Sequence, residues 1–402
     1  MRDVYRRLLG PQSPPLRRKT TVKRLGKTVP PVFGDFGGSR RLALKTQAFM
    51  QAGSTAPIAL IDVHATFREK RLKVAEWRIW AREQAENKSR RGEHIDTPSL
   101  ESLFIEIDWL IDDNISLEEQ DITPHTKLST YSNKVLGRNL SSEYLCLRVP
   151  LTELSLLWER RLCEHVPLQY LTHIAYWRDL ELLVNPDVLI PRPETELVVD
   201  WALEARAQSG SGQLECGPWL DLGTGSGAIA IALAKSFMVE NTGTHPYVYA
   251  VDISPGACSI ASYNLMRHGV QEVVRLVQTS WFDAFENDTE MQGAFAGIIS
   301  NPPYIPTDKL DSLQLEVRHE PSLALDGGTG AGVDSLTKIC MNAAKYLSQG
   351  GSLILETNGY DQSIMIREQL LSTSYFAKIE IRYDYFCVGR FVTARRNDTA
   401  WR

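Results

Sequence analysis

The chain has 402 residues, of which 43% are hydrophobic and 23% charged, an ordinary composition for a globular protein long enough to form two domains. Its net charge of −5 is uneven: residues 1–50 carry twelve Lys and Arg against two Asp, so this segment is +10 and the remainder is −15. The acidic remainder argues against a general electrostatic affinity for nucleic acid, and no apolar run approaches the ~18 residues of a membrane span.

Residues 1–55 are expected to be a leader. The segment is rich in Arg, poor in acidic residues and interrupted by Pro-Pro and Gly-Gly pairs, and it lacks the continuous apolar core of a secretory signal. This composition is typical of an organelle-targeting transit peptide. A disordered basic tail is the alternative.

Residues 66–172 are expected to form a small helical domain. Apolar residues recur at spacings of three and four in ATFREKRLKVAEWRIWAREQAEN, SLESLFIEIDWLIDD and PLTELSLLWERRLCEH. A polar stretch at 115–142 separates the last two segments and is predicted to be a loop.

Residues 173–196 are expected to be a hairpin linker. Two short apolar strands flank Asn185-Pro186-Asp187, which has the composition of a turn. The prolines of the following PRPETE segment end the second strand, and a helix begins after them.

From residue 197 to 402 strands and helices alternate. The strands are WLDLG, VYAVDIS, VRLVQ, AGIISN and GSLILET, and most are followed by helical patterns. This alternation predicts an α/β fold with a doubly wound, mainly parallel sheet, whose ligands bind at the carboxyl ends of the strands.

The first strand-to-helix turn has the sequence DLGTGSG, residues 221–227. Glycine at every second position lets the backbone approach a ligand closely at the N-terminal end of a helix. The spacing differs from the GxGxxG dinucleotide fingerprint, and no Lys follows as a P-loop would require. A tight turn without a ligand could use the same glycines.

Two further strand ends complete a nucleoside pocket. Asp252 ends the second strand, where an acid accepts hydrogen bonds from ribose hydroxyls, although an isolated Asp there could be a helix cap. Trp281 follows the third strand and could lie against an adenine ring or in the core. The three features together predict an S-adenosylmethionine pocket. No metal is expected, since the six cysteines show no CxxC spacing and no HxxxH is present.

The fourth strand ends in Asn301-Pro302-Pro303-Tyr304, and two prolines cannot continue a sheet. An amide or exocyclic amine nitrogen is a poor nucleophile because its lone pair is delocalised. The Asn301 side-chain oxygen and a backbone carbonyl near Pro302 can accept both N–H hydrogens and aim the nitrogen at a methyl donor. Tyr304 can flank the planar group. The motif therefore predicts methyl transfer to a planar nitrogen without a strong general base.

These motifs resemble those of the peptide-chain release factor glutamine N5-methyltransferases, most strongly from Pro167 to about Arg396. NPPY alone is shared with adenine and guanine methyltransferases, whereas NPPY together with IPRPETE is far more specific. The matching segments are PLQYLT (167–172), VLIPRPETE (188–196), DLGTGSGAIAIALA (221–234), VDIS (251–254), SNPPYIP (300–306), HEPSLALDGG (319–328) and GGSLILET (350–357).

The resemblance implies a Rossmann-like class I S-adenosylmethionine-dependent methyltransferase domain, preceded by a helical domain that helps to dock the release factor. The reaction would be transfer of a methyl group to the side-chain amide nitrogen of the glutamine in a Gly-Gly-Gln motif. The implied cofactor-binding residues are Asp221, Gly223, Thr224, Gly225, Gly227, Asp252, Trp281 and Asn301. The implied substrate-binding residues are Asn301, Pro302, Pro303 and Tyr304, and the implied supporting residues are Arg192, Glu194 and Thr195.

Three departures from the family pattern stand out. His173 occupies a position that is usually Gly, which puts the turn geometry there in question, and the acidic residue usual after DGG is displaced. The ETNG segment, residues 356–359, is similar to plant organellar members. Together with the basic leader it favours a plastid over a mitochondrial location.

Three hypotheses follow for the function. The first is a glutamine methyltransferase acting on an organellar release factor, as a monomer that contacts neither nucleic acid nor a membrane. The alternative is an N-methyltransferase acting on an exocyclic amine of a nucleic acid, against which the acidic charge argues. The third is a non-catalytic S-adenosylmethionine-binding scaffold, against which the intact NPPY argues.

Overall fold

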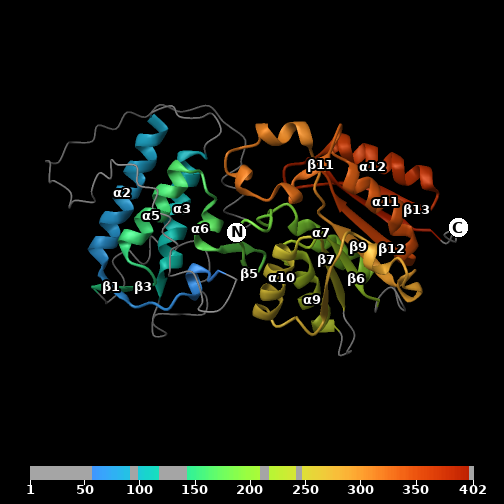
Figure 1. Cartoon of the computed structure of the whole chain (residues 1–402), viewed down its shortest axis with the longest axis horizontal. Coiled ribbons are helices and arrows are strands. Elements are labelled where there is room, and N and C mark those ends of the chain that lie inside the picture. The colour runs from blue at the N-terminus through green and yellow to red at the C-terminus, as the bar shows by residue number, and fades with distance from the viewer. Residues whose placement is uncertain (1–56, 91–97, 117–142, 209–216, 241–246, 398–402) are drawn as a thin grey trace.

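The computed structural model describes residues 57–90, 98–116, 143–208, 217–240 and 247–397. The expected leader, residues 1–55, lies outside the described residues, as does most of the loop expected at 115–142. Figure 1 shows a group of helices on the left and a sheet covered by helices on the right, with the polypeptide passing between them near α6 and β5.

The N-terminal part is mainly helical, as the periodicity predicts. Its core contains Trp77 and Trp158, whose indole N–H groups donate to Ser155 Oγ at 2.9 Å and to the Ala81 carbonyl at 3.0 Å. These bonds satisfy both buried donors. The helices are α2 (Arg71–Arg90), α3 (Leu100–Asn114), α5 (Leu151–Cys163) and α6 (Leu168–Thr172), preceded by the 3₁₀ turn η2 (Leu60–Asp62).

A small antiparallel sheet in this part was not predicted. It consists of β1 (Phe67–Lys70), β3 (Tyr144–Leu147) and β2 (Ile115–Ser116), with β3 in the middle. Strands of two to four residues are too short to show an alternating pattern, and β1 lies within a segment whose spacing predicts a helix.

The hairpin exists, but the expected position of its turn is wrong. The paired strands are β4 (Ile174–Trp177) and β5 (Leu180–Leu183), so the turn lies at Arg178-Asp179. Arg178 adopts a φ of 52°, its backbone N–H donates to Glu196 Oε1 at 3.1 Å, and its guanidinium donates to Asp200 at 2.9 Å. Residues 188–190 form no strand, and Val188 and Leu189 line a cavity.

His173 ends α6 with a φ of 55°, the left-handed conformation in which Gly is usual. Its ring Nδ1 lies 3.3 Å from the Val184 carbonyl of the following hairpin. His173 therefore adopts the backbone conformation that a Gly would favour at this place.

The C-terminal part is built on a seven-stranded sheet in the order β13-β14-β12-β9-β6-β7-β8. All neighbouring pairs from β8 to β12 are parallel, and β14 runs antiparallel to both of its neighbours. This order confirms the expected Rossmann-like class I methyltransferase fold. The strands are β6 (Trp219–Leu222), β7 (Val248–Asp252), β8 (Val274–Gln278), β9 (Phe295–Ser300), β12 (Leu347–Glu356), β13 (Phe376–Tyr383) and β14 (Gly389–Arg396).

Helices cover both faces of this sheet (Figure 1). Alternate residues of a strand point to opposite faces: Trp219 packs with α9, whereas Leu220 and Leu222 pack with α11 and α12. The helices on the first face are α7 (Glu196–Ala207), α9 (Ala228–Glu240) and α10 (Pro255–Arg267). Those on the second are α11 (Asp334–Tyr346) and α12 (Tyr360–Thr373).

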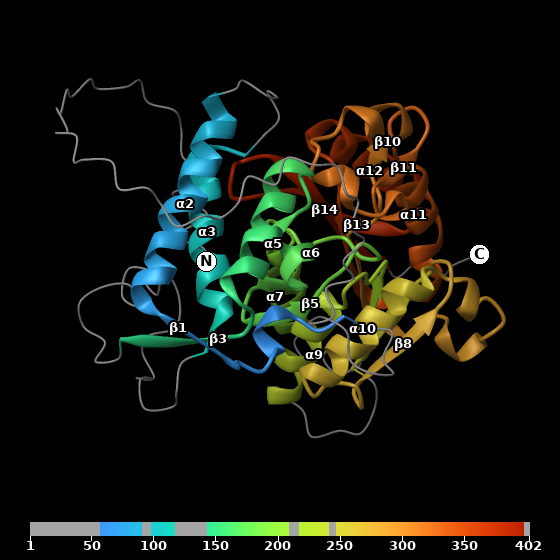
Figure 2. The ribbon, with the colours of Figure 1, turned by 60° about the vertical axis from the view of Figure 1, so that its left-hand side comes forward.

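The helical part and the sheet part share buried contacts. The core of the helical part continues through Leu183 of β5 to Ala257 and Ile260 of α10, and Figure 2 shows β5 close to α10. Among the described helices, none is both long and apolar enough to cross a membrane. The five cysteines that the structure describes are free.

The loop after β9 also connects the two parts. Arg161 of α5 donates to Glu106 of α3 at 2.6 Å and to Glu316 of this loop at 3.1 Å, and His319 Nε2 lies 2.8 Å from the Glu164 carbonyl. The elements of the loop are β10 (Ile305–Pro306), η6 (Thr307–Ser312), η7 (Val317–His319), η8 (Ser322–Ala324) and β11 (Asp326–Gly328); the shorter turns η4 (Asp283–Phe285) and η5 (Thr289–Met291) precede β9.

Candidate active site

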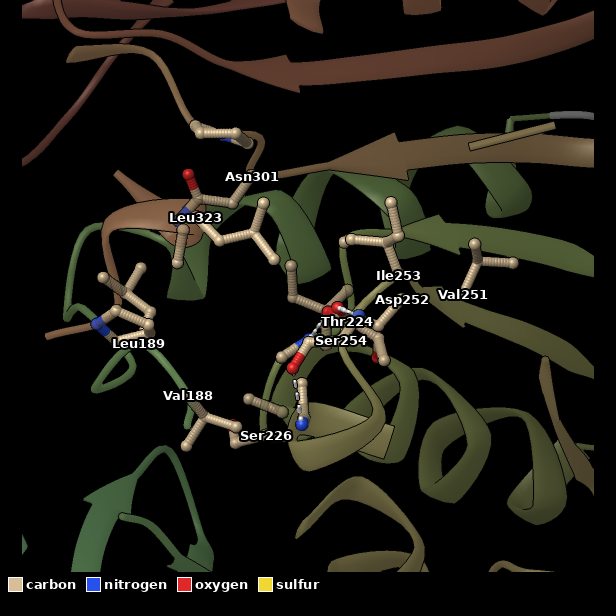
Figure 3. A pocket seen from close by; sticks show the side chains of 18 of the residues that line it. Val188, Leu189, Thr224, Ser226, Val251, Asp252, Ile253, Ser254, Asn301 and Leu323 are labelled. Carbon is tan, nitrogen blue, oxygen red and sulfur yellow. Dashed lines mark hydrogen bonds between the residues drawn. The ribbon is translucent and has the colours of Figure 1, made fainter. Parts of the chain in front are cut away.

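A cavity opens at the carboxyl ends of β6, β7, β8 and β9, where the order of the strands reverses. The glycine turn and the β7 end form one side, Val188 and Leu189 another, and Leu323 of the long loop lies across from them (Figure 3). Of the site residues predicted from the sequence, the lining contains Arg192, Thr195, Gly223, Thr224, Gly225, Asp252, Trp281, Asn301 and Pro303.

The remaining predicted residues lie behind this surface. The residues that do not line the cavity are Asp221, Gly227, Glu194, Pro302 and Tyr304. They would therefore act on a ligand only through the residues that they hold in place.

The glycine turn is held open by an acid at the end of β7. Gly223, Gly225 and Gly227 have φ values of 76°, 56° and 84°, a region of backbone conformation that residues other than glycine rarely adopt. Asp252 Oδ2 accepts from the Gly225 N–H and Oδ1 from the Ser254 N–H, both at 2.9 Å. Each carboxylate oxygen keeps a further lone pair for a ligand hydroxyl. Burial raises the pKa of Asp252, and these backbone donors oppose the rise.

Asp221 lies fully buried beneath the same turn. Its Oδ2 accepts from Thr224 Oγ1 at 2.6 Å, whereas Oδ1 has no hydrogen-bond partner among the described residues. Burial raises the pKa of Asp221 to about 7; the Thr224 hydroxyl and the Ala230 N–H oppose the rise, and the negative charge of Asp252 adds to it. A carboxylate with one unpaired oxygen behind the turn suits a cationic ligand. Together with the hydroxyl acceptor Asp252, it fits S-adenosylmethionine, which carries an ammonium, a sulfonium and a ribose.

Trp281 occupies both environments that the sequence leaves open. Its indole lines the cavity beside Gly223, where a Cβ would lie 3.8 Å from Cζ3. It is also partly buried against the core that packs on α11. The Trp281 side chain thus forms a wall of the cavity that the core keeps rigid.

Asn301 is the first residue after β9 and has one end of its amide fixed. Its Nδ2 donates to Thr195 Oγ1 at 3.2 Å, and no described residue bonds its Oδ1. Asn301 and Pro303 line the cavity, while Pro302 is buried. Figure 3 shows Asn301 at the edge of the cavity opposite Ser226. An amide oxygen at this position is available to accept from a ligand N–H.

Tyr304 does not flank the cavity as expected. Its hydroxyl donates to Glu356 Oε1 at 3.2 Å, so the ring points away behind the motif. Its backbone is held as well, because the Tyr304 carbonyl accepts from Gln362 Nε2 at 2.8 Å. A Cβ on Gly327 would lie 2.6 Å from the Tyr304 Cα. The glycines of the DGG segment thus allow β11 to pack directly against NPPY.

The displaced acid after DGG keeps contact with that segment. The Asp334 carboxylate, at the start of α11, packs against the Cα of Gly328, where no Cβ would fit. The insertion in DGGTGAGVD therefore leaves an acidic side chain beside the second glycine.

The PRPETE segment has ionic partners on two sides. Arg192 Nη2 donates to Glu320 Oε1 at 2.7 Å, and Glu320 Oε2 accepts from the Ile190 N–H at 3.3 Å. Glu194 lies outside the cavity, 3.6 Å from Arg390. Thr195 is at the N-cap of α7 but makes no side-chain cap bond. Its hydroxyl instead donates to Glu356 Oε2 at 2.7 Å.

Glu356 and Glu320 were not predicted from the sequence as residues of the site. Glu356 is the last residue of β12, and its neighbour Leu355 pairs with Ser300 of β9, so Glu356 lies beside Asn301 at the sheet edge. A polar residue at a strand's carboxyl end is the signal used for Asp252, and applied to GSLILET it would have identified Glu356. Burial raises the pKa of Glu356 to about 7. Glu320 lies in a loop, where nothing local indicates that it pairs with Arg192.

These buried acids make stability depend on pH. The pKa values of Asp221 and Glu356 are about 7 in the folded protein and near 4 in an unfolded chain. The folded state therefore binds more protons between these values, and their stabilising effect is lost as the pH rises through about 7. We expect the free energy of unfolding of the unliganded protein to fall by roughly half a kcal/mol per group from pH 7 to 8.5.

Urea unfolding at the two pH values measures this change. Glu356→Gln, which cannot titrate, should show a smaller fall than the unchanged protein. A free energy of unfolding that rises with pH over this interval would contradict the assignment of both acids.

In the part of the chain that the structure describes, no group of three or more His, Cys, Asp or Glu side chains could hold a metal ion. The acceptors at the cavity and behind it are the oxygens of Asp252, Asp221 and Asn301, and they suit a nucleoside cation and a planar amide.

Comparisons with known proteins agree with this chemistry. Residues 211–318 match the family model of the methyltransferase small domain. Over 250 residues the chain is 42% identical to the release factor glutamine methyltransferase of Thermosynechococcus vestitus, covering 62% of this chain and 81% of the relative. It is 43% identical over 241 residues to that of Gloeobacter violaceus, covering 60% and 78%. It is 39% identical over 240 residues to that of Synechocystis, covering 59% and 76%.

Proposed function

The chain belongs to the release factor glutamine methyltransferases, and on this basis we propose that it methylates the glutamine side-chain nitrogen in the Gly-Gly-Gln motif of an organellar release factor. It is an S-adenosylmethionine-dependent enzyme, as its family implies. The observation that carries the proposal is the anchored amide of Asn301, whose free oxygen lies at the cavity beside the glycine turn.

The protein residues of the cavity would bind and orient the two reactants. When bound, S-adenosylmethionine supplies an electrophilic methyl group on a sulfonium. Asp252 would accept from the ribose hydroxyls, since both of its oxygens keep a lone pair after bonding Gly225 and Ser254. Asp221 would provide negative charge behind the turn, and Trp281 would border the adenine.

Asn301 would orient the glutamine nitrogen. Its Oδ1 accepts one N–H of the substrate carboxamide, and a backbone carbonyl near Pro302 accepts the other. With both hydrogens held, the face of the nitrogen points at the methyl group, with the reacting atoms roughly 3–3.5 Å apart. After the transfer the nitrogen carries a positive charge and its N–H is very acidic. The proton is therefore lost without a strong base.

A methyl-transfer assay tests the reaction. The protein is incubated with labelled S-adenosylmethionine and a release factor carrying Gly-Gly-Gln, and the matched control is the same factor with Gly-Gly-Glu. Label should enter the first protein and not the second. Equal labelling of both would overturn the glutamine assignment, and labelling of RNA or DNA instead would support the alternative nucleic-acid function.

We also propose that the helical part helps to dock the release factor, and that the enzyme is a monomer. The helical part supports docking because α5 contacts the loop that borders the cavity, through Arg161 and Glu316. Size-exclusion chromatography with light scattering, which should give the mass of one chain, checks the oligomeric state.

The location that we propose is an organelle, and a plastid rather than a mitochondrion. The +10 charge of residues 1–50 supports a transit peptide. The ETNG segment, residues 356–359, is similar to plant organellar members of the family, and this supports the plastid.

A fluorescent protein fused to the first 60 residues should therefore enter plastids. A protein lacking residues 1–55 should fold and methylate at the full rate, because the described core begins after this segment. Fluorescence that stays in the cytosol would contradict the targeting role, and loss of activity on truncation would show that the segment belongs to the enzyme.

A further inference from the structure

Four side chains form a continuous hydrogen-bonded chain behind the cavity. Asn301 Nδ2 donates to Thr195 Oγ1 at 3.2 Å, and Thr195 Oγ1 donates to Glu356 Oε2 at 2.7 Å. The Tyr304 hydroxyl donates to the other oxygen of Glu356 at 3.2 Å. Glu356 is fully buried and does not line the cavity, so it can act on a ligand only through Thr195 and Asn301.

The direction of these bonds decides which end of Asn301 faces the ligand. An asparagine amide has nearly the same shape after a half turn that exchanges oxygen and nitrogen. A hydroxyl can donate or accept, whereas a carboxylate can only accept. The ionised Glu356 carboxylate therefore accepts the hydrogen bond that the Thr195 hydroxyl donates, and this leaves the Thr195 oxygen as an acceptor for Asn301 Nδ2. A turned Asn301 would place its oxygen against an oxygen that has no proton to give.

Two features show that this arrangement is not the one that stability alone would favour. Thr195 is at the N-cap of α7, where a hydroxyl ordinarily accepts from the first turn, but its side chain makes no cap bond. Among the described residues no cation lies within ion-pair distance of Glu356, and a buried carboxylate without a cation costs stability. A glutamine would be less costly to bury at this place.

We propose that Glu356 is a positioning residue that, through Thr195, holds Asn301 with its oxygen toward the substrate amide. The inference rests on the proposed function, since it deepens the role of Asn301 in the same reaction. Glu356 touches neither reactant. Its effect is to fix the single orientation of Asn301 that can accept a substrate N–H.

Neutralisation of Glu356 separates this role from a structural one. In Glu356→Gln, the amide can accept from only one of the two hydroxyls and must donate to the other. Thr195 can then turn its proton to Asn301, and both orientations of Asn301 become populated. We expect kcat to fall on the order of tenfold, with unchanged affinity for S-adenosylmethionine and a Tm equal to or above that of the unchanged protein.

Two further sets of variants serve as controls. Thr195→Val removes the hydroxyl at nearly constant volume and should lower kcat at least as much, and Thr195→Ser should restore most of the turnover. Asp113→Asn neutralises another acid, which accepts from Tyr176 and whose pKa burial likewise raises to about 7; neither residue lines the cavity. It should leave kcat unchanged.

The assay uses the full chain with S-adenosylmethionine and a Gly-Gly-Gln release factor. If Glu356→Gln matches Asp113→Asn in kcat, or loses Tm in proportion to activity, the inference is wrong although the proposed function stands. If the unchanged protein does not methylate the factor, the proposed function fails.

The orientation of Asn301 can then still be tested by NMR of its side-chain N–H₂ signal with S-adenosylhomocysteine bound. Glu356→Gln should shift the signal and speed its hydrogen exchange. An unchanged signal would overturn the inference.

Discussion

Asn301→Ala should lower kcat for methylation of the release factor on the order of 10²-fold or more, because the oxygen that orients the nitrogen is lost. The fold should remain, since the side chain makes a single hydrogen bond with the described residues, to Thr195, at the edge of the cavity. Affinity for S-adenosylmethionine should fall much less than turnover does. Single-turnover kinetics and calorimetry measure the two effects separately.

Asn301→Asp is the matched control. It keeps the shape and the acceptor oxygen but cannot donate to Thr195, so it should retain more activity than the alanine variant and less than the unchanged protein. If Asn301 only caps a loop, the alanine variant would melt at a lower temperature and yet methylate at a near-normal rate below it. That pattern would rule out the role of Asn301 in orientation.

Asp252→Ala should weaken binding of S-adenosylhomocysteine on the order of 10²-fold, because hydrogen bonds to a charged acceptor are worth roughly 1.5–3 kcal/mol each. The loss has a second cause in this protein. Gly225 and Ser254 also lose the acceptor of their backbone N–H groups, so the glycine turn is less well held.

Calorimetry with Asp252→Ala and Asp252→Asn measures this effect. The asparagine variant keeps one acceptor oxygen and should bind with intermediate affinity. Equal affinity of the alanine variant and the unchanged protein would refute the assignment of the ribose to Asp252.

The parts of the site that follow from local chemistry could be predicted from the sequence. The turn DLGTGSG contains the three glycines that need positive φ, and Asp252 and Asn301 both end strands that alternate with helices. Because parallel strands end at one edge of a sheet, the order of elements alone brings these residues together. The fold class follows from the same alternation.

The parts that depend on distant partners could not be predicted. The turn at Arg178-Asp179 has no Gly or Asn to mark it and depends on Glu196 and Asp200, so Asn185-Pro186-Asp187 gave the stronger local signal. The direction of Tyr304 depends on Glu356, which lies 52 residues away in the chain.

The final strands also have weak local signals. β13 alternates charged and apolar residues at the edge of the sheet, and β14 returns antiparallel beside β12. Neither strand was predicted. β13 is an edge strand that buries one face only, so its alternation of apolar and charged residues is easily taken for that of a surface segment.

The central claim is that the anchored amide of Asn301 presents a carboxamide nitrogen for methylation. Fragment mass spectrometry of a release factor incubated with the enzyme and S-adenosylmethionine tests it most directly. The account predicts one added methyl group, on the side-chain nitrogen of the Gly-Gly-Gln glutamine, and much less of it with Asn301→Ala. A methyl group on any other residue, or an equal yield from that variant, would contradict it.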